Sequence, residues 1–280
     1  MRNGLLTLLL LACSALHAQK IIYTAEDSLF VTRVLAKHAG SKKEKGALLL
    51  AIANEFIGHK YVAGTLERSV EEPLTVSIHE VDCTTFVEQA LALAVTAADN
   101  GGSFAQFIEN LEKIRYRGGK RNGYASRLHY VSQWIADSSK IGIIEEISYG
   151  DYGKKDTLRI DFMSKHAESY KLLKENEALI GEIAKWETAI SGREIYYIPK
   201  GRLWHKGREL NIKDGDILVL TTGIDGLDAV HMGIAFIEDE EVRMLHASSA
   251  AEKVIKEKRT LFDYQKNRKN QTGARVFRLK

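Results

Sequence analysis

Three side chains in this 280-residue sequence could together perform nucleophilic acyl chemistry. Cys83 directly follows Asp82, a residue type that favours the N-cap position, so we expect the cysteine in the first turn of a helix. The unpaired N–H groups and the dipole at a helix start favour a thiolate over a thiol. Cys83 is therefore a candidate nucleophile; the alternative is a buried cysteine that acts only as a small apolar residue.

The partners of this thiol would be two histidines on neighbouring strands. Residues 230–236 alternate between large apolar side chains and a face that carries His231 with two small residues, which suits the close approach of a helix start. A hairpin loop of two or four residues at 238–241 would place His246 opposite Gly233, on the same face as His231. A three-residue loop would place the two imidazoles on opposite faces.

In such a Cys–His–His arrangement each residue has a defined task. Cys83 would attack an acyl carbon, His231 would carry the proton to the leaving nitrogen, and His246 would orient His231. The alternative is that each histidine is an ordinary structural residue.

Other catalytic patterns are weaker. His79 and Cys83 have the i, i+4 spacing of metal ligands, but no third ligand is evident. The sequence contains no His-Glu-x-x-His, no Gly-x-Ser-x-Gly and no Ser-x-x-Lys. We therefore expect neither a metal ion nor an organic cofactor.

The remaining sequence predicts the elements that would position these residues. A capping-box pattern from Ser41 to Glu44 predicts the start of a helix that runs to Phe56. Helical patterns cover residues 22–57, 84–98, 103–140 and 163–190, and strand patterns cover 195–198, 216–220, 230–237, 242–246 and 275–279. Because helices come first and strands later, the sequence predicts an α+β fold.

The beginning of the chain has the pattern of a signal peptide. Arg2 precedes the apolar residues 5–12, a run too short to span a bilayer, and small residues follow. Cleavage after Ala18 would remove residues 1–18, whereas Leu-Leu-Ala-Cys at 10–13 resembles a lipobox that would make Cys13 a lipid-bearing N-terminus. We expect an exported, periplasmic protein, with a lipoprotein as the alternative.

The body that would remain, residues 19–280, is expected to form a single catalytic domain. It contains Cys83 as its one thiol and so cannot form an internal disulfide. The formal net charge of +3 gives no electrostatic reason to expect a nucleic-acid partner.

Around Cys83 the sequence resembles the NlpC-type branch of the papain-like cysteine peptidases. The resemblance rests on Asp-Cys-Thr-Thr-Phe at 82–86 and on segments in the same order as in that family, at 58–65, 213–218, 230–234 and 245–249. A closer resemblance is to its N-acetylmuramoyl-L-alanine amidase-like subgroup. It is carried by Asp-Cys-Thr-Thr-Phe-Val-Glu at 82–88, Ser-Arg-Leu-His-Tyr at 126–130, Trp134, and Gly-Leu-Asp at 226–228.

This resemblance, which covers roughly residues 45–265, implies a papain-like core with a largely helical insertion at about residues 100–200. It implies hydrolysis, through a thioester, of the amide between N-acetylmuramic acid and L-alanine in muropeptides. Tyr61 would orient the thiol or help to hold the oxyanion, and Asp82 would support the loop. The backbone N–H of Cys83 would donate to the oxyanion.

The substrate contacts implied by the resemblance lie near the nucleophile and in the insertion. Thr84, Arg127, His129 and Tyr130 would line the cleft, and the guanidinium would suit a stem-peptide carboxylate. The alternative for the last three residues is the edge of an ordinary amphipathic helix. Trp204, which is followed by His205, could stack on a sugar.

Two other functions remain open at the level of sequence. One is an endopeptidase that cuts the stem peptide between D-glutamate and the diamino acid, although Asp-Cys-Thr-Thr replaces the Asp-Cys-Ser-Gly usual in such enzymes. The other is a wall-binding protein without turnover. No protein partner is implied.

Overall fold

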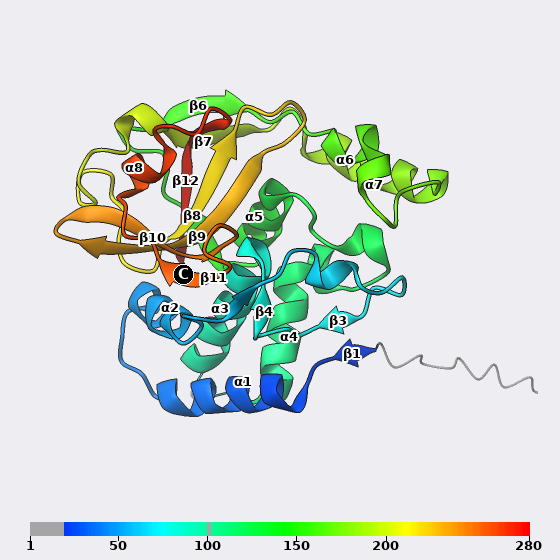
Figure 1. Cartoon of the computed structure of the whole chain (residues 1–280), viewed down its shortest axis with the longest axis horizontal. Helices are drawn as coiled ribbons and strands as arrows, with labels where there is room; N and C mark the ends of the chain where they lie inside the picture. The colour runs from blue at the N-terminus through cyan, green and yellow to red at the C-terminus, as the bar shows by residue number, and fades with distance from the viewer. Residues whose placement is uncertain (1–19, 100–101) are drawn as a thin grey trace, which may run out of the picture.

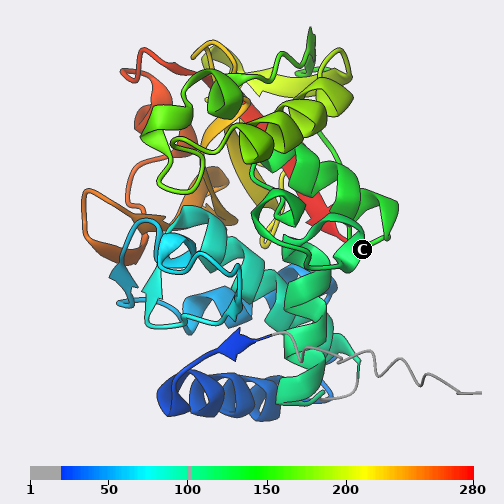
Figure 2. The ribbon, with the colours of Figure 1, turned by 90° about the vertical axis from the view of Figure 1, so that its right-hand side faces the viewer.

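The helical patterns of the first half of the chain form a layer on one side of the molecule (Figure 1). The structure, a computed structural model, describes residues 20–99 and 102–280. The layer contains α1 (Ala25–His38), α2 (Lys45–Asn54), α3 (Cys83–Ala98) and α4 (Phe104–Arg115). Figures 1 and 2 both place α1 on the side of this layer that is remote from the central strands of the large sheet.

The strand patterns of the second half form the centre of a mixed sheet, so the α+β fold is confirmed. The central strands are β8 (Ile217–Thr222), β9 (Ala229–Glu238), β10 (Glu241–Ser248) and β12 (Gln271–Leu279). The order is β4-β2-β11-β10-β9-β8-β12-β7-β6, and β5 also pairs with β12. The shorter strands are β2 (Lys60–Tyr61), β4 (Glu80–Val81), β5 (Ile144–Glu146), β6 (Lys154–Thr157), β7 (Glu194–Pro199) and β11 (Lys253–Lys256).

The segment just before α1 is attached to the helical layer by a separate pair of parallel strands. These are β1 (Ile21–Ile22) and β3 (Leu74–Thr75). The predicted signal peptide and lipobox lie outside the described residues. In the part of the chain that the structure describes, no helix is long and apolar enough to cross a membrane.

The segments around α5 (Val131–Lys140), α6 (Phe162–Lys165) and α7 (Glu177–Ile190) form an arm that stands beside the sheet (Figure 2). Of the other elements between residues 102 and 200, α4 belongs to the helical layer, and β5, β6 and β7 pair into the large sheet. The apolar sides of α6 and α7 enclose a separate small core with residues from the 3₁₀ turn η3 (Tyr124–Ser126). The arm therefore has its own buried support and can present fixed side chains toward β9.

Two faces of the sheet are buried in different ways. α3 packs on the β9 face that carries Met232, Ile234 and Phe236. The opposite face, with Ala235, is covered by residues that include those of the short helix α8 (Leu261–Gln265). The prediction that α3 approaches the small-residue face was wrong, because the large apolar face offers the helix more area to bury.

The predicted capping box at Ser41 was also wrong. α2 begins four residues later, at Lys45, and its N-cap residue Glu44 makes no side-chain cap hydrogen bond. The hydroxyl of Ser41 instead accepts a hydrogen bond from the backbone N–H of Lys43 in a local turn. A serine that can bond to a nearby backbone group competes in this way with helix formation.

The start of α2 lies against the turn before β8 with almost no space between the two backbones. A Cβ atom on Gly215 would lie 1.8 Å from the carbonyl oxygen of Gly46, and one on Gly46 would lie 2.7 Å from that of Asp214. Gly215 also has a φ of +84°, which L side chains rarely adopt. This contact fixes the helical layer against the strand that neighbours β9.

We predict that Gly215→Ala strongly destabilises the protein. Gly40→Ala is the matched control, because Gly40 also has a positive φ, +66°, but has open space around its Cβ position. The control should lose only the cost of the left-handed conformation, about 1–2 kcal/mol. Urea unfolding measures both free energies. An equal loss in the two variants would contradict the close contact.

Candidate active site

The β9–β10 hairpin brings the two predicted histidines together. Its turn has two residues, Asp239 and Glu240, both with positive φ, and pairs Glu238 with Glu241. The predicted register is therefore confirmed. Nε2 of His231 lies 2.6 Å from Nδ1 of His246, and the two rings are nearly perpendicular at 87°.

The thiol of Cys83 lies where β9 and β10 separate. Their described pairing ends at Ile234 and Leu245, so the part of β9 that carries His231 is not paired with β10. Between β8 and β9 the register also shifts just before His231, which is typical of a β-bulge beside a functional site. The backbone N–H of Met232 faces the sulfur. α3 packs on the face of the sheet opposite to the one that carries His231. The sulfur of Cys83 nevertheless reaches the edge of β9 that β10 leaves unpaired.

Asp82 is the N-cap of α3, as predicted, and it forms a capping box with Thr85. Its carboxylate accepts a hydrogen bond from the backbone N–H of Thr85 at 2.8 Å, and the Thr85 hydroxyl accepts one from the backbone N–H of Asp82 at 2.9 Å. Cys83 is the first residue of the helix. Two orphan donors are thereby satisfied, and the thiol is held in the first turn.

The electrostatics of the thiol differ from the prediction of a resting thiolate. Burial and, to a smaller extent, the charge of Asp82 raise the pKa of Cys83 to about 11. The N–H groups of Met232 and Cys83 and the hydroxyl of Thr84 oppose this shift. The prediction was wrong because it counted the helix start but not the loss of solvent around the sulfur.

Both imidazoles are neutral at ordinary pH. Burial lowers the pKa of His231 to about 3, with smaller contributions from His246 and Arg268. Burial likewise lowers the pKa of His246 to about 4, although the charge of Glu257 raises it. At rest the site therefore holds a neutral thiol and a neutral pair of imidazoles.

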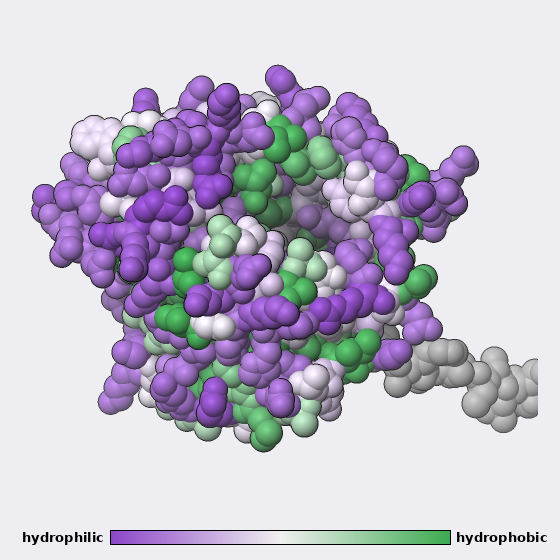
Figure 3. All heavy atoms as spheres, in the orientation of Figure 1, coloured by the Kyte–Doolittle hydropathy of each residue, from purple (hydrophilic) through white to green (hydrophobic). Residues whose placement is uncertain are grey.

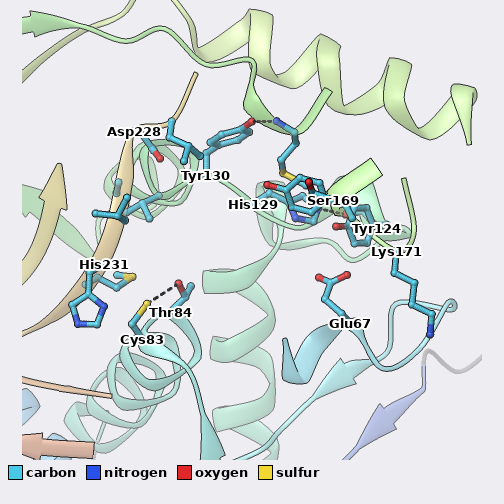
Figure 4. A pocket seen from close by; sticks show the side chains of 17 residues that line it. Glu67, Cys83, Thr84, Tyr124, His129, Tyr130, Ser169, Lys171, Asp228 and His231 are labelled. Atoms are coloured by element: carbon cyan, nitrogen blue, oxygen red, sulfur yellow. Dashed lines mark hydrogen bonds between the residues drawn. The ribbon is translucent and has the colours of Figure 1, made fainter. Parts of the chain in front are cut away.

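Cys83 and His231 lie at one end of a cavity of about 470 Å³. Its walls come from the start of α3, from β9 and the two residues before it, from Glu67, and from the arm around α5 and α6. Figure 3 shows a hollow between the sheet and the arm, with apolar side chains at its edge. Figure 4 shows the His231 ring and the Cys83 sulfur at the same end, with Glu67 and Lys171 at the other.

Three of the predicted contact residues line this cavity: Thr84, His129 and Tyr130. Nε2 of His129 lies 2.8 Å from the carbonyl oxygen of Tyr124. The Tyr130 hydroxyl donates to Glu187 at 2.6 Å and accepts from the backbone N–H of Met163 at 2.7 Å. Tyr130 therefore presents mainly ring surface to the cavity, since its hydroxyl is already paired, and His129 is held in place through Nε2.

Arg127 and Trp204 lie elsewhere. Arg127 is buried, and its guanidinium contacts the carboxylates of Glu67 and Glu72. It is not among the described residues that line the cavity; Glu67, which it holds, is. Trp204 is 57% exposed, stacks on His205, and does not line this cavity either.

Tyr61 lies near the nucleophile, on β2. It is half-buried and packs against the core beside Cys83. Burial raises the pKa of its hydroxyl, and the nearby charges of Cys83 and Asp82 raise it further. Its hydroxyl is therefore a proton donor at neutral pH.

Sequence reasoning missed several residues of the site. Glu67, Tyr124 and Lys171 line the cavity but lie outside the motifs, so only the fold could place them there. Asp228, also in the wall, accepts a hydrogen bond from the backbone N–H of Ser132 and thereby caps α5. Glu257 and Tyr264 also contact the pair of imidazoles. The ring of Tyr264 stacks with that of His231, with 6.2 Å between the ring centroids.

Across the described ranges, no three His, Cys, Asp or Glu side chains are grouped to hold a metal ion.

Comparison with known proteins assigns the family. A model of the AmiA-like family, described as N-acetylmuramoyl-L-alanine amidase-like, matches residues 51–273. The chain belongs to this AmiA-like family. Its members are amidase-like peptidoglycan hydrolases by the description of the family. A comparison with curated proteins gave no match.

Solved structures agree with this assignment. An N-acetylmuramoyl-L-alanine amidase from Bacteroides uniformis is 39% identical with a TM-score of 0.81, over 85% of this chain and 100% of that one. A Bacteroides fragilis protein described as a "putative xylanase" is 42% identical with a TM-score of 0.78, over 82% and 100%. A Legionella pneumophila protein, 20% identical with a TM-score of 0.69 over 91% and 94%, shares the fold.

We predict that alkylation of Cys83 by iodoacetamide has its midpoint well above pH 8.5, the ordinary cysteine pKa. Asp82→Asn should lower this midpoint, because it removes the negative charge beside the sulfur while leaving an amide that can cap α3. Asp99→Asn, at the far end of the same helix, is the control and should leave the midpoint unchanged. Peptide mass spectrometry follows the reaction. A plateau of fast alkylation reaching down to pH 5 would contradict the neutral thiol.

Proposed function

We propose that this protein hydrolyses the amide between N-acetylmuramic acid and L-alanine in muropeptides, with Cys83 as the nucleophile. The observation that carries the proposal is the 2.6 Å hydrogen bond between His231 and His246, made beside the cavity that contains the only thiol of the described chain. Family membership supports the amide as the bond that is cut.

His231 would serve as the base through its Nδ1 atom. Nε2 is occupied by His246, so Nδ1 is the nitrogen left for the thiol. Because both groups are neutral at rest, the thiol proton moves to Nδ1 as the sulfur attacks the carbonyl carbon. The imidazolium then gives this proton to the leaving nitrogen of L-alanine, and water hydrolyses the thioester. Neither step requires a metal or an organic cofactor.

The oxyanion would be held by groups at the start of α3. The backbone N–H of Cys83 is the first donor, since it lies unpaired at a helix start. Tyr61, whose protonated hydroxyl lies close to the thiol, would orient the sulfur or supply a second donor. We infer that the arrangement is papain-like and of NlpC type, because it combines a helix-start cysteine with polar residues on two successive strands.

The remote end of the cavity would bind the peptide stem. Glu67 and Lys171 lie there and provide opposite charges, which suits a stem that carries both ammonium and carboxylate groups. Arg127 would act through Glu67 by holding its carboxylate, rather than by touching the substrate. The rings of His129 and Tyr130 would form the wall between the two ends.

Export to the periplasm belongs to the same proposal. Its support is the charged start and the short apolar run at residues 5–12, in a chain whose family acts on the cell wall. Cleavage after Ala18 would leave Lys20 near the mature start, and its backbone carbonyl accepts a hydrogen bond from Arg121. A lipid at Cys13 is the alternative.

Three other functions give different products. An endopeptidase would release fragments in which L-alanine and D-glutamate remain on the sugar, and a wall-binding protein would release nothing. A glycosidase, suggested by the description of the Bacteroides fragilis structure, would need a pair of carboxylates free to act as acid and base. In the cavity Glu67 is bound to Arg127 and Asp228 to Ser132, which disfavours that role.

We predict that the wild-type protein releases a sugar that carries no alanine from defined muropeptides. Cys83→Ala should lose at least about 10³-fold in rate because the nucleophile is gone. Product masses identify the bond, and circular dichroism checks that the variant is folded. Sugar products that retain L-alanine and D-glutamate would contradict the amidase, and equal inactivity of both proteins would contradict enzymatic function.

We also predict an unusually acidic lower limb in the pH profile of kcat/KM. His231 must be neutral to accept the thiol proton, and burial lowers its pKa to about 3. Activity should therefore persist as the pH falls through about 6.5, where an ordinary histidine becomes protonated. Steady-state rates between pH 4 and 8 test this, with a lower limb centred at pH 6.5 or above as the contradicting result.

A further inference from the structure

Nε2 of His246 is buried and accepts or donates no hydrogen bond within the described chain. His246 is 1% exposed, so water does not satisfy this nitrogen. The nearest charged group is the carboxylate of Glu257, whose Oε2 atom lies 3.9 Å away. An orphan nitrogen that faces a buried carboxylate is unusual enough to suggest a task for that carboxylate.

The backbone places Glu257 opposite this nitrogen in a fixed way. β11 pairs with β10 so that Ile255 lies opposite His246, and the backbone N–H of Glu257 donates to the carbonyl oxygen of Met244. Glu257 is thus a diagonal neighbour of His246 on the same face of the sheet. It is 8% exposed.

Arg259 fixes the orientation of this carboxylate. Its guanidinium donates to both oxygens, from Nε at 3.1 Å and from Nη2 at 2.8 Å, and its backbone N–H donates to Oε1 at 3.1 Å. These bonds lower the pKa of Glu257 to about 2, so it is ionised at neutral pH. A fixed negative charge therefore faces Nε2 of His246.

Such a charge selects one tautomer of a neutral imidazole. An N–H that points at a carboxylate is attracted, whereas a lone pair in the same place is repelled. With the proton on Nε2, His246 has a bare Nδ1 that must accept its hydrogen bond, so His231 must donate from Nε2. His231 then has its own lone pair on Nδ1.

We propose that Glu257 is a positioning residue, which holds the protons of the His246–His231 pair so that Nδ1 of His231 is left free to accept the proton of Cys83. For its effect on catalysis this inference rests on the proposed function. The assignment of tautomers does not depend on that function, because it concerns the resting protein.

The test is Glu257→Gln, which keeps the shape of the side chain but removes its charge. Long-range ¹⁵N–¹H spectra give the tautomer of each imidazole, and loss of signals in His231→Gln and His246→Gln assigns them. In the wild type both histidines should carry the proton on Nε2. In Glu257→Gln the Nδ1–H form should appear in both, because the charge that disfavoured it is gone.

The kinetic expectation is a fall in kcat of about 10- to 100-fold, as is typical when a group that orients a catalytic histidine is changed. KM should stay within about twofold of the wild-type value, since Glu257 does not line the cavity in the described structure. Glu252→Gln, which removes an exposed carboxylate from the turn before β11, is the matched control and should change neither spectra nor rates.

A second variant separates orientation from stability. Arg259→Gln removes the ion pair from the other side, but the backbone N–H of residue 259 still holds Oε1 of Glu257, so the carboxylate should keep facing His246 and retain the Nε2–H tautomers. Unchanged tautomers in Glu257→Gln would overturn the proposal, even if activity falls. If the wild-type protein cuts no muropeptide, the proposed function fails, yet the spectra still decide the role of Glu257.

Discussion

The separation of β9 from β10 beyond Ile234 and Leu245 is the constraint on which the rest of the site depends. Farther along, the two strands are joined by a two-residue turn that fixes the register of the hairpin. That register puts both imidazoles on one face, and the opening exposes an edge of β9 to the start of α3. In this way the thiol of a helix that packs on one face of the sheet can lie in the same cavity as a histidine that belongs to the other face. If the ladder continued, the backbone N–H of Met232 would have less room to face the sulfur.

Burial then determines how the chemistry can proceed. Taking Cys83 and both histidines out of solvent favours the neutral form of each, and this effect is larger than that of the helix start. In the proposed mechanism a resting thiolate–imidazolium pair is therefore not the starting point, and the proton moves only when an acyl group arrives. Because neutral imidazoles have two tautomers, the direction of each proton must be set by the surroundings. The ionised carboxylate of Glu257 is the group placed to do so.

Local rules of sequence anticipated much of this. A turn of two or four residues and the alternation of β9 predicted the contact of His231 with His246, and Asp82 predicted the start of α3, because these features depend on neighbours in sequence. The face used by α3 and the pKa of Cys83 were wrong because both depend on burial between distant segments. Glu257 was missed since β11 is a short strand without a clear alternation, and the cavity walls from the arm have no local signal.

The central claim is that Cys83 attacks the carbonyl next to the sugar and carries its acyl group as a thioester. The most direct measurement is rapid-quench mass spectrometry of the protein mixed with a muramoyl peptide, followed by proteolysis. The account predicts a transient adduct on the Cys83 peptide with the mass of the free N-acetylmuramic acid sugar less one water. An adduct that also contains L-alanine and D-glutamate would contradict the assignment of the bond. Turnover with Cys83 unmodified at every time, or an adduct on another residue, would contradict the nucleophile.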